Sequence, residues 1–331
     1  MSSAVVRDAR GDALAVSPVF HSNYRLDTSL PAGLRRLTRQ IGRIFPRLMN
    51  LSVIGLGSPV MDRCAIGFQS ALSRPQRAAA FAAMLGGMEA SALAQGEDLI
   101  AVKDLTDDDC GWADPILIDL GFAKMPSLPV AILDLPFTSG EEYLRSLAAS
   151  SRRDLRRKLR QQSQVRFEVR TDVNGFEPEL LKLYEATRSN GGAGYDSFDA
   201  LSPTYFRTIV EELDGRALIV LGWVDSVLAS FSLMLVAPDC VYAHQIGMRY
   251  PLARQHNMYF RNWMFVVRFC LERGIRRLEF GQTSYPVKVR LGCRLERSWV
   301  YVKHRVRPIN AVLRRVAPMF AFDRMEVGAT G

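Results

Sequence analysis

Two apolar segments in the second half of the chain carry side chains suited to proton transfer. His244 lies within the alternating apolar stretch 241–248. A neutral imidazole near neutral pH is a suitable general base, whereas a histidine in a hydrophobic core needs only one hydrogen-bond partner. Gln282 opens a polar run, 282–284, at the end of a second apolar segment, where amide and hydroxyl groups either orient a substrate or form a turn. The pattern predicts an acid–base site at two strand ends, with a purely structural role as the alternative.

Other reactive side chains carry weaker signals. Cys293 follows a glycine but has no histidine at a spacing typical of a nucleophile–base pair. Glu279 lies in a short predicted strand and is either a base or half of an ion pair with Arg276 or Arg277. The five cysteines are odd in number and form no CxxC pair, so the sequence indicates neither a metal site nor a disulfide framework.

Cations concentrate in two segments whose apolar residues have helical spacing. The net charge of +9 suggests an anionic partner. The segment 139–164 holds six cations between residues 152 and 160 and predicts a basic helix. The segment 25–50 predicts a basic amphipathic helix. Its candidate contacts with an anionic membrane surface are Arg35, Arg36, Arg39, Arg43 and Arg47. A solvated face, RNA and a phosphate-bearing cofactor are the alternatives.

Composition is that of a folded protein, with 331 residues, 48% hydrophobic and 23% charged. No stretch is long and apolar enough for a membrane-spanning helix. The first 16 residues carry Arg and Asp where a secretory signal needs an apolar core. We therefore expect a cytoplasmic protein with reduced thiols. Peripheral association with the inner face of the membrane is the alternative within this expectation.

Patterns of strands and helices predict two domains, at 1–135 and 136–331. The first is an α/β region. In the second, the helix at 139–164 precedes two more helices, three antiparallel strands, a long helix at 257–273, a strand that stops at Gly281, and a last strand. An amphipathic helix is predicted at 308–322, with Arg314 and Arg315 opposite its apolar face.

Three blocks, in this order, resemble the GNAT N-acyltransferase superfamily, in its FemAB-like or acetyltransferase-6 branch. SSRRDLRRKLRQ (150–161) resembles the basic helix that opens the catalytic region. ALIVLGWVDSVLASFSLMLVAPDCVYAHQIGM (217–248) resembles the central meander, and CLERGIRRLEFGQTSYPVKVRLGC (270–293) resembles the closing Tyr-x-x-Lys signature. The resemblance implies an α/β, layered α+β fold. A mixed, mainly antiparallel sheet is flanked by helices, and the first domain is a degenerate second GNAT-like half.

The resemblance also implies roles for individual residues. His244 would be the base, Tyr285 would reprotonate a leaving thiolate, and Lys288 would bind the acceptor or polarise the carbonyl, with Gln282 orienting the acceptor. Packing or surface roles are the alternatives for Tyr285 and Lys288. The family's glycine-rich pyrophosphate loop is replaced here by residues without those glycines. The implied donor-binding residues are Gln245, Ile246, Gly247, Met248, Arg254, Gln255, His256, Asn257 and Met258.

The resemblance implies an enzyme that transfers an acyl group from acyl-CoA to a primary amine, without a metal. Two arginine-rich helices favour a long-chain or lipid amine as the acceptor. Because the pyrophosphate loop lacks its glycines, acyl carrier protein and aminoacyl-tRNA stay open as donors. A Fem-type aminoacyl transferase and a non-catalytic binding protein are therefore the alternatives.

Overall fold

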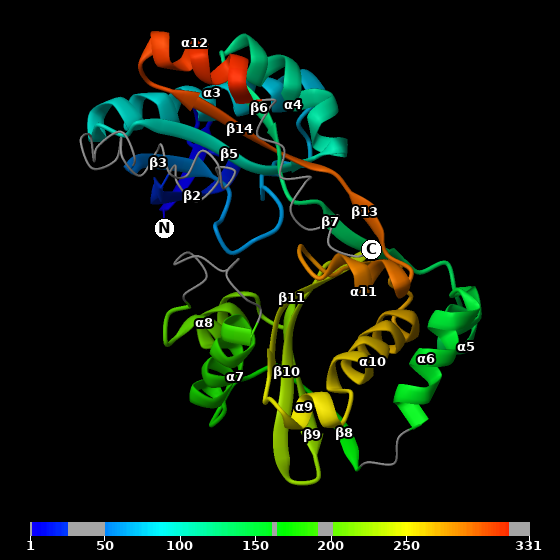
Figure 1. Ribbon diagram of the computed structural model, residues 1–331. Coiled ribbons are helices and arrows are strands. Elements are labelled where there is room, and N and C mark those ends of the chain that lie inside the picture. Colours follow the sequence, from blue (N-terminus) through cyan, green and yellow to red (C-terminus); the bar gives the residue numbers. More distant parts are fainter. Residues whose placement is uncertain (1, 26–49, 161–163, 191–200, 318–331) are drawn as a thin grey trace, which may run out of the picture. The chain divides into compact units, whose positions relative to one another are not determined.

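The computed structural model describes residues 2–25, 50–160, 164–190 and 201–317, which belong to two compact units (Figure 1). Unit 1 comprises Met1–Pro129 together with Glu296–Gly331, and unit 2 comprises Val130–Leu295. The chain therefore passes into unit 2 after Pro129 and returns to unit 1 after Leu295. The predicted second domain, 136–331, is therefore divided, because residues from Glu296 onward belong to unit 1.

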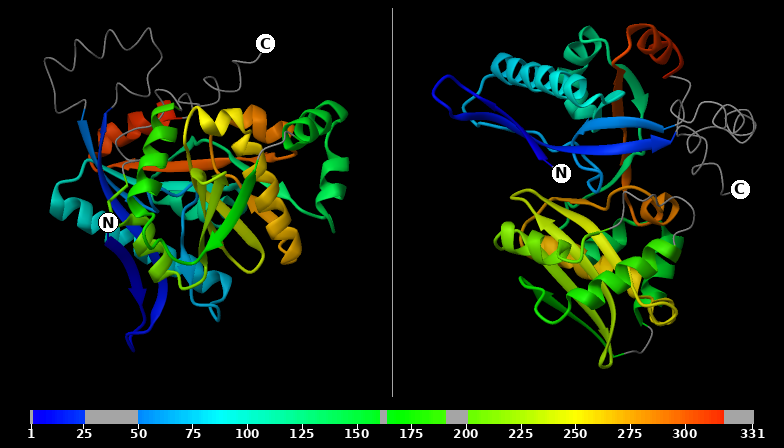
Figure 2. Two further views of the ribbon diagram at one scale, coloured as in Figure 1. Left: turned by 90° about the horizontal axis from the view of Figure 1, so that it is seen from below. Right: turned by 90° about the vertical axis from the view of Figure 1, so that its left-hand side faces the viewer.

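Unit 1 is built on a seven-stranded sheet in the order β1-β2-β3-β5-β14-β6, with β4 paired to β2. Neighbouring strands are antiparallel except β3 and β5, which are parallel. The β1–β2 hairpin runs alongside α3 (Figure 2), whose Phe81 and Leu85 are fully buried. The elements are β1 (Ser2–Arg7), β2 (Ala13–Arg25), β3 (Asn50–Leu56), β4 (Gly67–Phe68), α3 (Arg74–Gln95), β5 (Leu99–Thr106), α4 (Asp107–Asp119), β6 (Ala123–Pro126), β14 (Ser298–His304) and α12 (Arg307–Val316).

Unit 2 has a seven-stranded sheet in the order β13-β7-β12-β11-β10-β9-β8. Helices cover both faces of this sheet, with α7 and α8 on one face and α5, α6 and α10 on the other (Figure 1). The elements are β7 (Val130–Asp134), α5 (Gly140–Ser146), α6 (Ala149–Arg160), β8 (Val165–Arg170), α7 (Glu177–Asn190), α8 (Tyr205–Glu212), β9 (Ala217–Val224), β10 (Val227–Val236), β11 (Cys240–Met248), α9 (Leu252–Gln255), α10 (Met258–Glu272), β12 (Arg277–Glu279), α11 (Tyr285–Arg290) and β13 (Arg294–Glu296).

The two sheets share one strand plan. In unit 1, β3 leads through α3 to its parallel neighbour β5, and in unit 2, β11 leads through α10 to its parallel neighbour β12. In each sheet, a strand that is distant in sequence from this parallel pair lies between the second strand of the pair (β5 or β12) and an edge strand (β6 or β13). This strand is β14 in unit 1 and β7 in unit 2. The pairing of β14 with β5 and β6 places the chain's last strand in unit 1.

The predicted fold class, a mixed and mainly antiparallel sheet flanked by helices, is confirmed. The three-stranded meander is present as β9, β10 and β11. The predicted single helix at 139–164 is two helices, because Leu147 has an extended backbone conformation that ends α5. Most of the predicted basic helix at 25–50, with Arg35, Arg36, Arg39, Arg43 and Arg47, lies outside the described residues. So does the part of the predicted helix 308–322 that follows residue 317.

Within the described ranges, no helix is both long and apolar enough to cross a membrane. The exposed flank of α12 carries Ile309 (44% exposed) and Val312 (62% exposed), with Arg314 and Arg315 nearby on the same helix. This helix is therefore amphipathic, as the sequence predicts for its residues up to 316.

A buried hydrogen-bond relay ties α5 to α10 and to the end of α11. The Tyr143 hydroxyl accepts a hydrogen bond from Trp263 Nε1 at 2.9 Å and donates one to the Leu291 carbonyl at 2.8 Å. Tyr143 is fully buried, and Trp263 is 1% exposed. A buried donor or acceptor that loses its partner destabilises the folded state by about 1–3 kcal/mol.

We expect Tyr143→Phe to lower the free energy of unfolding by about 1–3 kcal/mol, because it leaves two buried groups without their partner. Urea denaturation of the intact chain measures this. Tyr250→Phe is the matched control, since the Tyr250 hydroxyl donates only a 3.7 Å bond to the Met248 sulfur. Its expected effect is within about 0.5 kcal/mol. Equal effects of the two substitutions would show that the relay contributes nothing to stability.

Candidate active site in unit 2

The parallel strands of unit 2 separate after three pairs of residues. β11 pairs with β12 only from Cys240–Arg277 to Tyr242–Glu279, and then continues alone on that edge to Met248. On its other edge, β11 pairs with β10 from Val241 to Met248, with one irregularity in the register. Backbone polar groups on this edge of β11 beyond residue 242 are therefore not used by β12. We expect a bound substrate at this unpaired part of the edge.

His244 lies at a β-bulge in this separated part of β11. Leu233 of β10 is opposite Gln245, and Met234 is opposite Ala243, so His244 is the extra residue with no counterpart in β10. A bulge redirects side chains and often lies next to an active site. The side chain points toward α8, where the Tyr205 hydroxyl lies 3.0 Å from His244 Nε2.

Burial determines which group carries the proton in this pair. It lowers the pKa of His244 to about 4 and raises the pKa of Tyr205 to about 12. At neutral pH the imidazole is uncharged and the phenol is protonated, so the tautomer of the imidazole sets whether the Tyr205 hydroxyl donates to Nε2 or Nε2–H donates to the hydroxyl oxygen. A neutral histidine bonded to a phenol can accept a proton and return it.

Sequence reasoning missed Tyr205. It is the first residue of α8 and is separated from His244 by 38 intervening positions, with no spacing signal that links the two. The Tyr205 ring makes a T-shaped contact with Phe206, at 5.3 Å between ring centroids. Phe206 in turn contacts Phe231 in the core of unit 2. Only the packing of α8 on the sheet brings this tyrosine to β11.

The other predicted catalytic residues gather where the chain leaves β12. Tyr285 is the first residue of α11 and is 4% exposed, so its ring is packed inside unit 2. Lys288 is 6% exposed, and its ammonium group donates to three backbone carbonyls, those of Phe280, Gly281 and Gln282. Gln282 therefore takes part through its backbone carbonyl.

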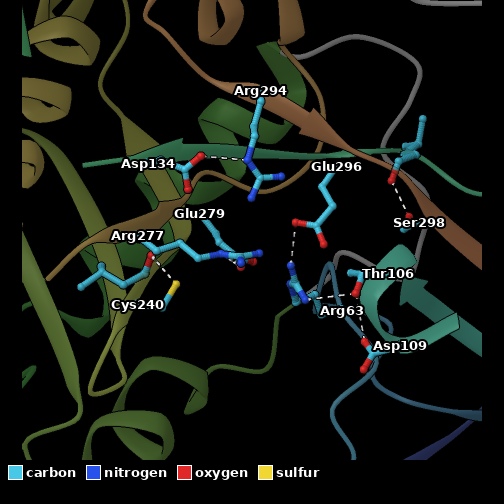
Figure 3. Close-up of polar contacts among 12 residues, drawn as sticks. Arg63, Thr106, Asp109, Asp134, Cys240, Arg277, Glu279, Arg294, Glu296 and Ser298 are labelled. Carbon is cyan, nitrogen blue, oxygen red and sulfur yellow. Dashed lines mark hydrogen bonds and ion pairs between the residues drawn. The ribbon is translucent and has the colours of Figure 1, made fainter. Parts of the chain in front are cut away.

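Glu279 is committed to an ion pair rather than free to act as a base. Its carboxylate lies 3.0 Å from Arg277 Nε, on the same face of β12, and the residue is 4% exposed (Figure 3). On neighbouring strands of unit 2, Arg294 pairs with Asp134 at 2.8 Å (Figure 3). The sequence left two roles open for Glu279, a base or an ion-pair partner of Arg276 or Arg277, and in the structure Glu279 forms an ion pair with Arg277.

The predicted donor-binding residues 245–248 are strand residues of β11, and three of them have structural partners. The Gln245 side chain is hydrogen-bonded to the Tyr205 hydroxyl. A Cβ atom on Gly247 would lie 2.8 Å from the carbonyl carbon of Leu183, so this glycine permits the close approach of α7. The amide of Met248 donates to the Thr187 hydroxyl at 2.8 Å. Amides two residues apart in a strand point to the same edge, which directs the Ile246 amide toward the opening.

The loop between β11 and α10 supplies part of what the missing glycines would give. Asn257 precedes α10 with a φ of 53°, the left-handed conformation that glycine and asparagine adopt most readily. Arg254 is held by Asn190 at 2.9 Å and lies over the Tyr250 ring. Gln255 ends the four-residue helix α9, and Met258 begins α10 and is fully buried.

His256 is the remaining residue of this loop. Its Nδ1 atom is buried and has no hydrogen-bond partner in the part of the chain that the structure describes. The start of α10 combines a helix N-terminus, where the Phe260 amide is bonded to the Asn257 carbonyl, with cationic and imidazole side chains, an arrangement that suits a phosphate group.

The basic helix α6 lies against α10, with Lys158 Nζ 3.7 Å from the centre of the Phe260 ring. Several of its cations are neutralised within unit 2, since Arg156 pairs with Glu141, and Lys158 pairs with Asp154 at 2.7 Å. Arg153 and Arg160 are exposed and have no ion-pair partner within the described ranges. A hollow of about 890 Å³ runs along this face and includes both arginines.

The corresponding end of the parallel pair in unit 1 is occupied by its own loop. After β3, the amide of Cys64 donates to the Asp104 carbonyl at 2.9 Å, and Lys103 Nζ donates to the Met61 carbonyl at 2.7 Å. Nearby, Arg63 pairs with Glu296 (Figure 3). Unit 1 thus uses this position for its own chain, and the opening with a bulged histidine belongs to unit 2.

The fold and the separated strands define a GNAT-type transferase domain. Residues 149–289 match the family described as acetyltransferase (GNAT) domain. Those residues therefore belong to the GNAT superfamily, and the fold is that of its FemAB-like branch.

Similar solved structures cover both units. A TM-score of 0.57 relates this chain to the C-terminal domain of a putative lysylphosphatidylglycerol synthetase from Agrobacterium fabrum, at 12% identity over 94% of this chain and 89% of that one. FemX gives the same TM-score, at 14% identity over 94% of this chain and 90% of that one. At these identities the likeness shows the fold alone.

A curated relative is similar in sequence as well. It is the putative 8-amino-7-oxononanoate synthase 2 of Mycobacterium tuberculosis, at 25% identity over 287 residues. The match covers 83% of this chain but 36% of the relative, so the chain spans about a third of that protein's length.

Proposed function

We propose that this protein is an N-acyltransferase that moves an acyl group from acyl-CoA to a primary amine at the opening between β11 and β12. The observation that carries the proposal is the bulged His244, held at Nε2 by Tyr205 in the part of β11 that β12 leaves unpaired. A neutral imidazole there can take a proton from an incoming ammonium group.

The proposed reaction joins the amine nitrogen to the acyl carbon and breaks the carbon–sulfur bond. His244, relayed by Tyr205, removes the proton that the amine must lose. The Ile246 amide, which points to the open edge of β11, would donate to the developing oxyanion. The removed proton finally reaches the departing thiolate, and Tyr285 is the residue that the family resemblance assigns to this step.

Donor binding at the start of α10 is part of the proposal. The amides at that helix end, with Arg254, Gln255, His256 and Met258 around them, would hold the pyrophosphate of acyl-CoA. The left-handed Asn257 supports this, because it gives the loop the conformation for which the family uses glycine. A long-chain or lipid amine as acceptor, and a place at the inner face of the membrane, remain proposals that rest on the basic and amphipathic segments.

The proposal is tested by thermal stability and product formation together. Acetyl-CoA, palmitoyl-CoA and desulfo-CoA are each added to the purified protein, since a ligand at 100 times its Kd stabilises the folded state by about 2.7 kcal/mol. Amine acceptors of increasing chain length are then incubated with the stabilising donor, and products are identified by mass spectrometry. Absence of both stabilisation and acylated amine with every CoA thioester would refute the proposal.

Aminoacyl-tRNA is the second candidate donor, and two features of unit 2 favour it. The Met248 amide is already used by Thr187, which reduces the backbone donors left for a pyrophosphate. The exposed Arg153 and Arg160 are seven residues apart, about 10 Å along the axis of α6, and suit successive phosphates of RNA.

If RNA is the donor, we expect Arg153→Gln/Arg160→Gln to weaken tRNA binding and to reduce the slope of log Kd against log salt by about 2. Filter binding between 50 and 200 mM salt measures both quantities. Arg314→Gln/Arg315→Gln, on α12 of unit 1, is the charge-matched control and should leave the slope unchanged. Identical slopes in all three proteins would exclude α6 as the RNA contact.

A further inference from the structure

Lys288 forms a buried clasp at the end of β12. Its Nζ atom lies 2.7 Å from the carbonyl oxygen of Phe280, 3.2 Å from that of Gly281 and 2.7 Å from that of Gln282. An ammonium group has three donors and no acceptor, so these three carbonyls use its whole hydrogen-bonding capacity. The side chain is 6% exposed, which makes the clasp an interior feature of unit 2.

The clasped segment has an unusual backbone. Gly281, Thr283 and Ser284 have φ values of 66°, 64° and 50°. For residues other than glycine, the left-handed conformation is strained, and it persists only where the surroundings hold it. Three carbonyls that converge on one ammonium group supply such a restraint.

Two further contacts of the segment fix its position within unit 2. The Gly281 carbonyl also accepts a hydrogen bond from the Ala131 amide of β7 at 3.0 Å. The Phe280 ring stacks on Trp263 of α10 at 3.5 Å between ring centroids. Lys288 therefore joins a strand end that is already anchored to β7 and α10, and it sets the path of the residues that follow.

We propose that Lys288 is a positioning residue, which holds 280–284 as the wall of the opening that faces the free edge of β11. For its effect on the reaction, this inference rests on the proposed function. The lysine does not touch the substrate in this role, because its three N–H groups are all given to backbone carbonyls. It acts by keeping the distance between the end of β12 and β11 constant.

Chemical rescue separates a clasp from a proton-transfer group. Lys288→Ala leaves three carbonyls around an ammonium-sized space, which ammonium, methylammonium or potassium ions can fill. We expect the variant to lose about 100-fold in kcat, as a misplaced reacting group does, with a smaller change in KM. We expect each of the three cations to restore activity. The uncharged variant Lys288→Met should respond to none of them, and Lys182→Ala, an exposed lysine of α7, is the control.

Amide hydrogen exchange of residues 280–284 provides a readout that needs no substrate. Exchange there should become faster in Lys288→Ala and slow again with potassium, which carries no proton. Rescue by amines alone, in proportion to their basicity, would overturn the clasp in favour of proton transfer. Unchanged exchange in the variant would also overturn it. If wild-type protein acylates no amine, the proposed function fails while the exchange experiment still decides the clasp.

Discussion

Replacing His244 with glutamine is expected to lower kcat/KM for amine acylation by about 100- to 10,000-fold. Glutamine keeps a polar group near Tyr205 but cannot take up a proton. In the structure, His244 is the bulged residue of β11, and its Nε2 is hydrogen-bonded to the Tyr205 hydroxyl. Steady-state kinetics with saturating donor and varied amine measure the loss.

The pH profile gives this prediction a second readout. Burial lowers the pKa of His244 to about 4, below the ordinary 6.5. The acid limb of kcat/KM should therefore fall near pH 4 in the wild type and vanish in His244→Gln. Between pH 6.5 and 4 the unfolded chain binds a proton that folded His244 does not, so this residue's contribution to stability is complete above pH 6.5 and declines as pH falls toward 4.

Two further variants accompany this test. Tyr205→Phe removes the hydroxyl that relays the proton to the imidazole, and we expect it to lower kcat about as much as His244→Gln does. His21→Gln, in unit 1, replaces a histidine that pairs with Glu97 at 3.0 Å and should leave the kinetics unchanged. Full activity in His244→Gln, with unaltered melting, would remove His244 from the site.

Gly247→Ala is expected to destabilise unit 2 by about 3 kcal/mol or more. An added Cβ would overlap the Phe231 ring and lie 2.8 Å from the Leu183 carbonyl carbon, which is backbone and cannot rotate away. Overpacking in a well-packed core costs about 1–3 kcal/mol, and contact with backbone lies at the upper end or above. Because α7 would have to move from β11, the Met248–Thr187 hydrogen bond should weaken as well.

Gly86→Ala is the matched control for that substitution. Gly86 is an exposed residue inside α3, and a Cβ there would meet nothing within 4 Å. Alanine in a helix interior is more favourable than glycine by about 0.5–1 kcal/mol, so this variant should be slightly more stable than wild type. Urea denaturation of both variants measures the change in the free energy of unfolding, which should be opposite in sign for the two. An unchanged free energy of unfolding in Gly247→Ala would mean that α7 does not pack as described.

Local sequence patterns predicted the elements whose pattern is complete within one segment. Alternating apolar residues predicted β9, β10 and β11, and the long apolar helix pattern before Gly274 predicted α10. The prediction placed the basic helical segment correctly but gave it one helix instead of two. The extended residue Leu147, which separates the two helices, does not interrupt the helical spacing of the apolar residues. The short helix α11 was not predicted, since its six residues are too few for a periodic pattern.

By itself, the sequence determined the order of β9, β10, β11 and α10 in unit 2, its GNAT likeness, and His244 and Lys288 as residues to inspect. Only the tertiary structure decided where β7 and β14 pair, because strand partners far apart in sequence leave no local pattern. The same reason applies to the site. Tyr205 reaches His244 through the packing of α8, and Lys288 turns inward because three backbone carbonyls converge on its ammonium group.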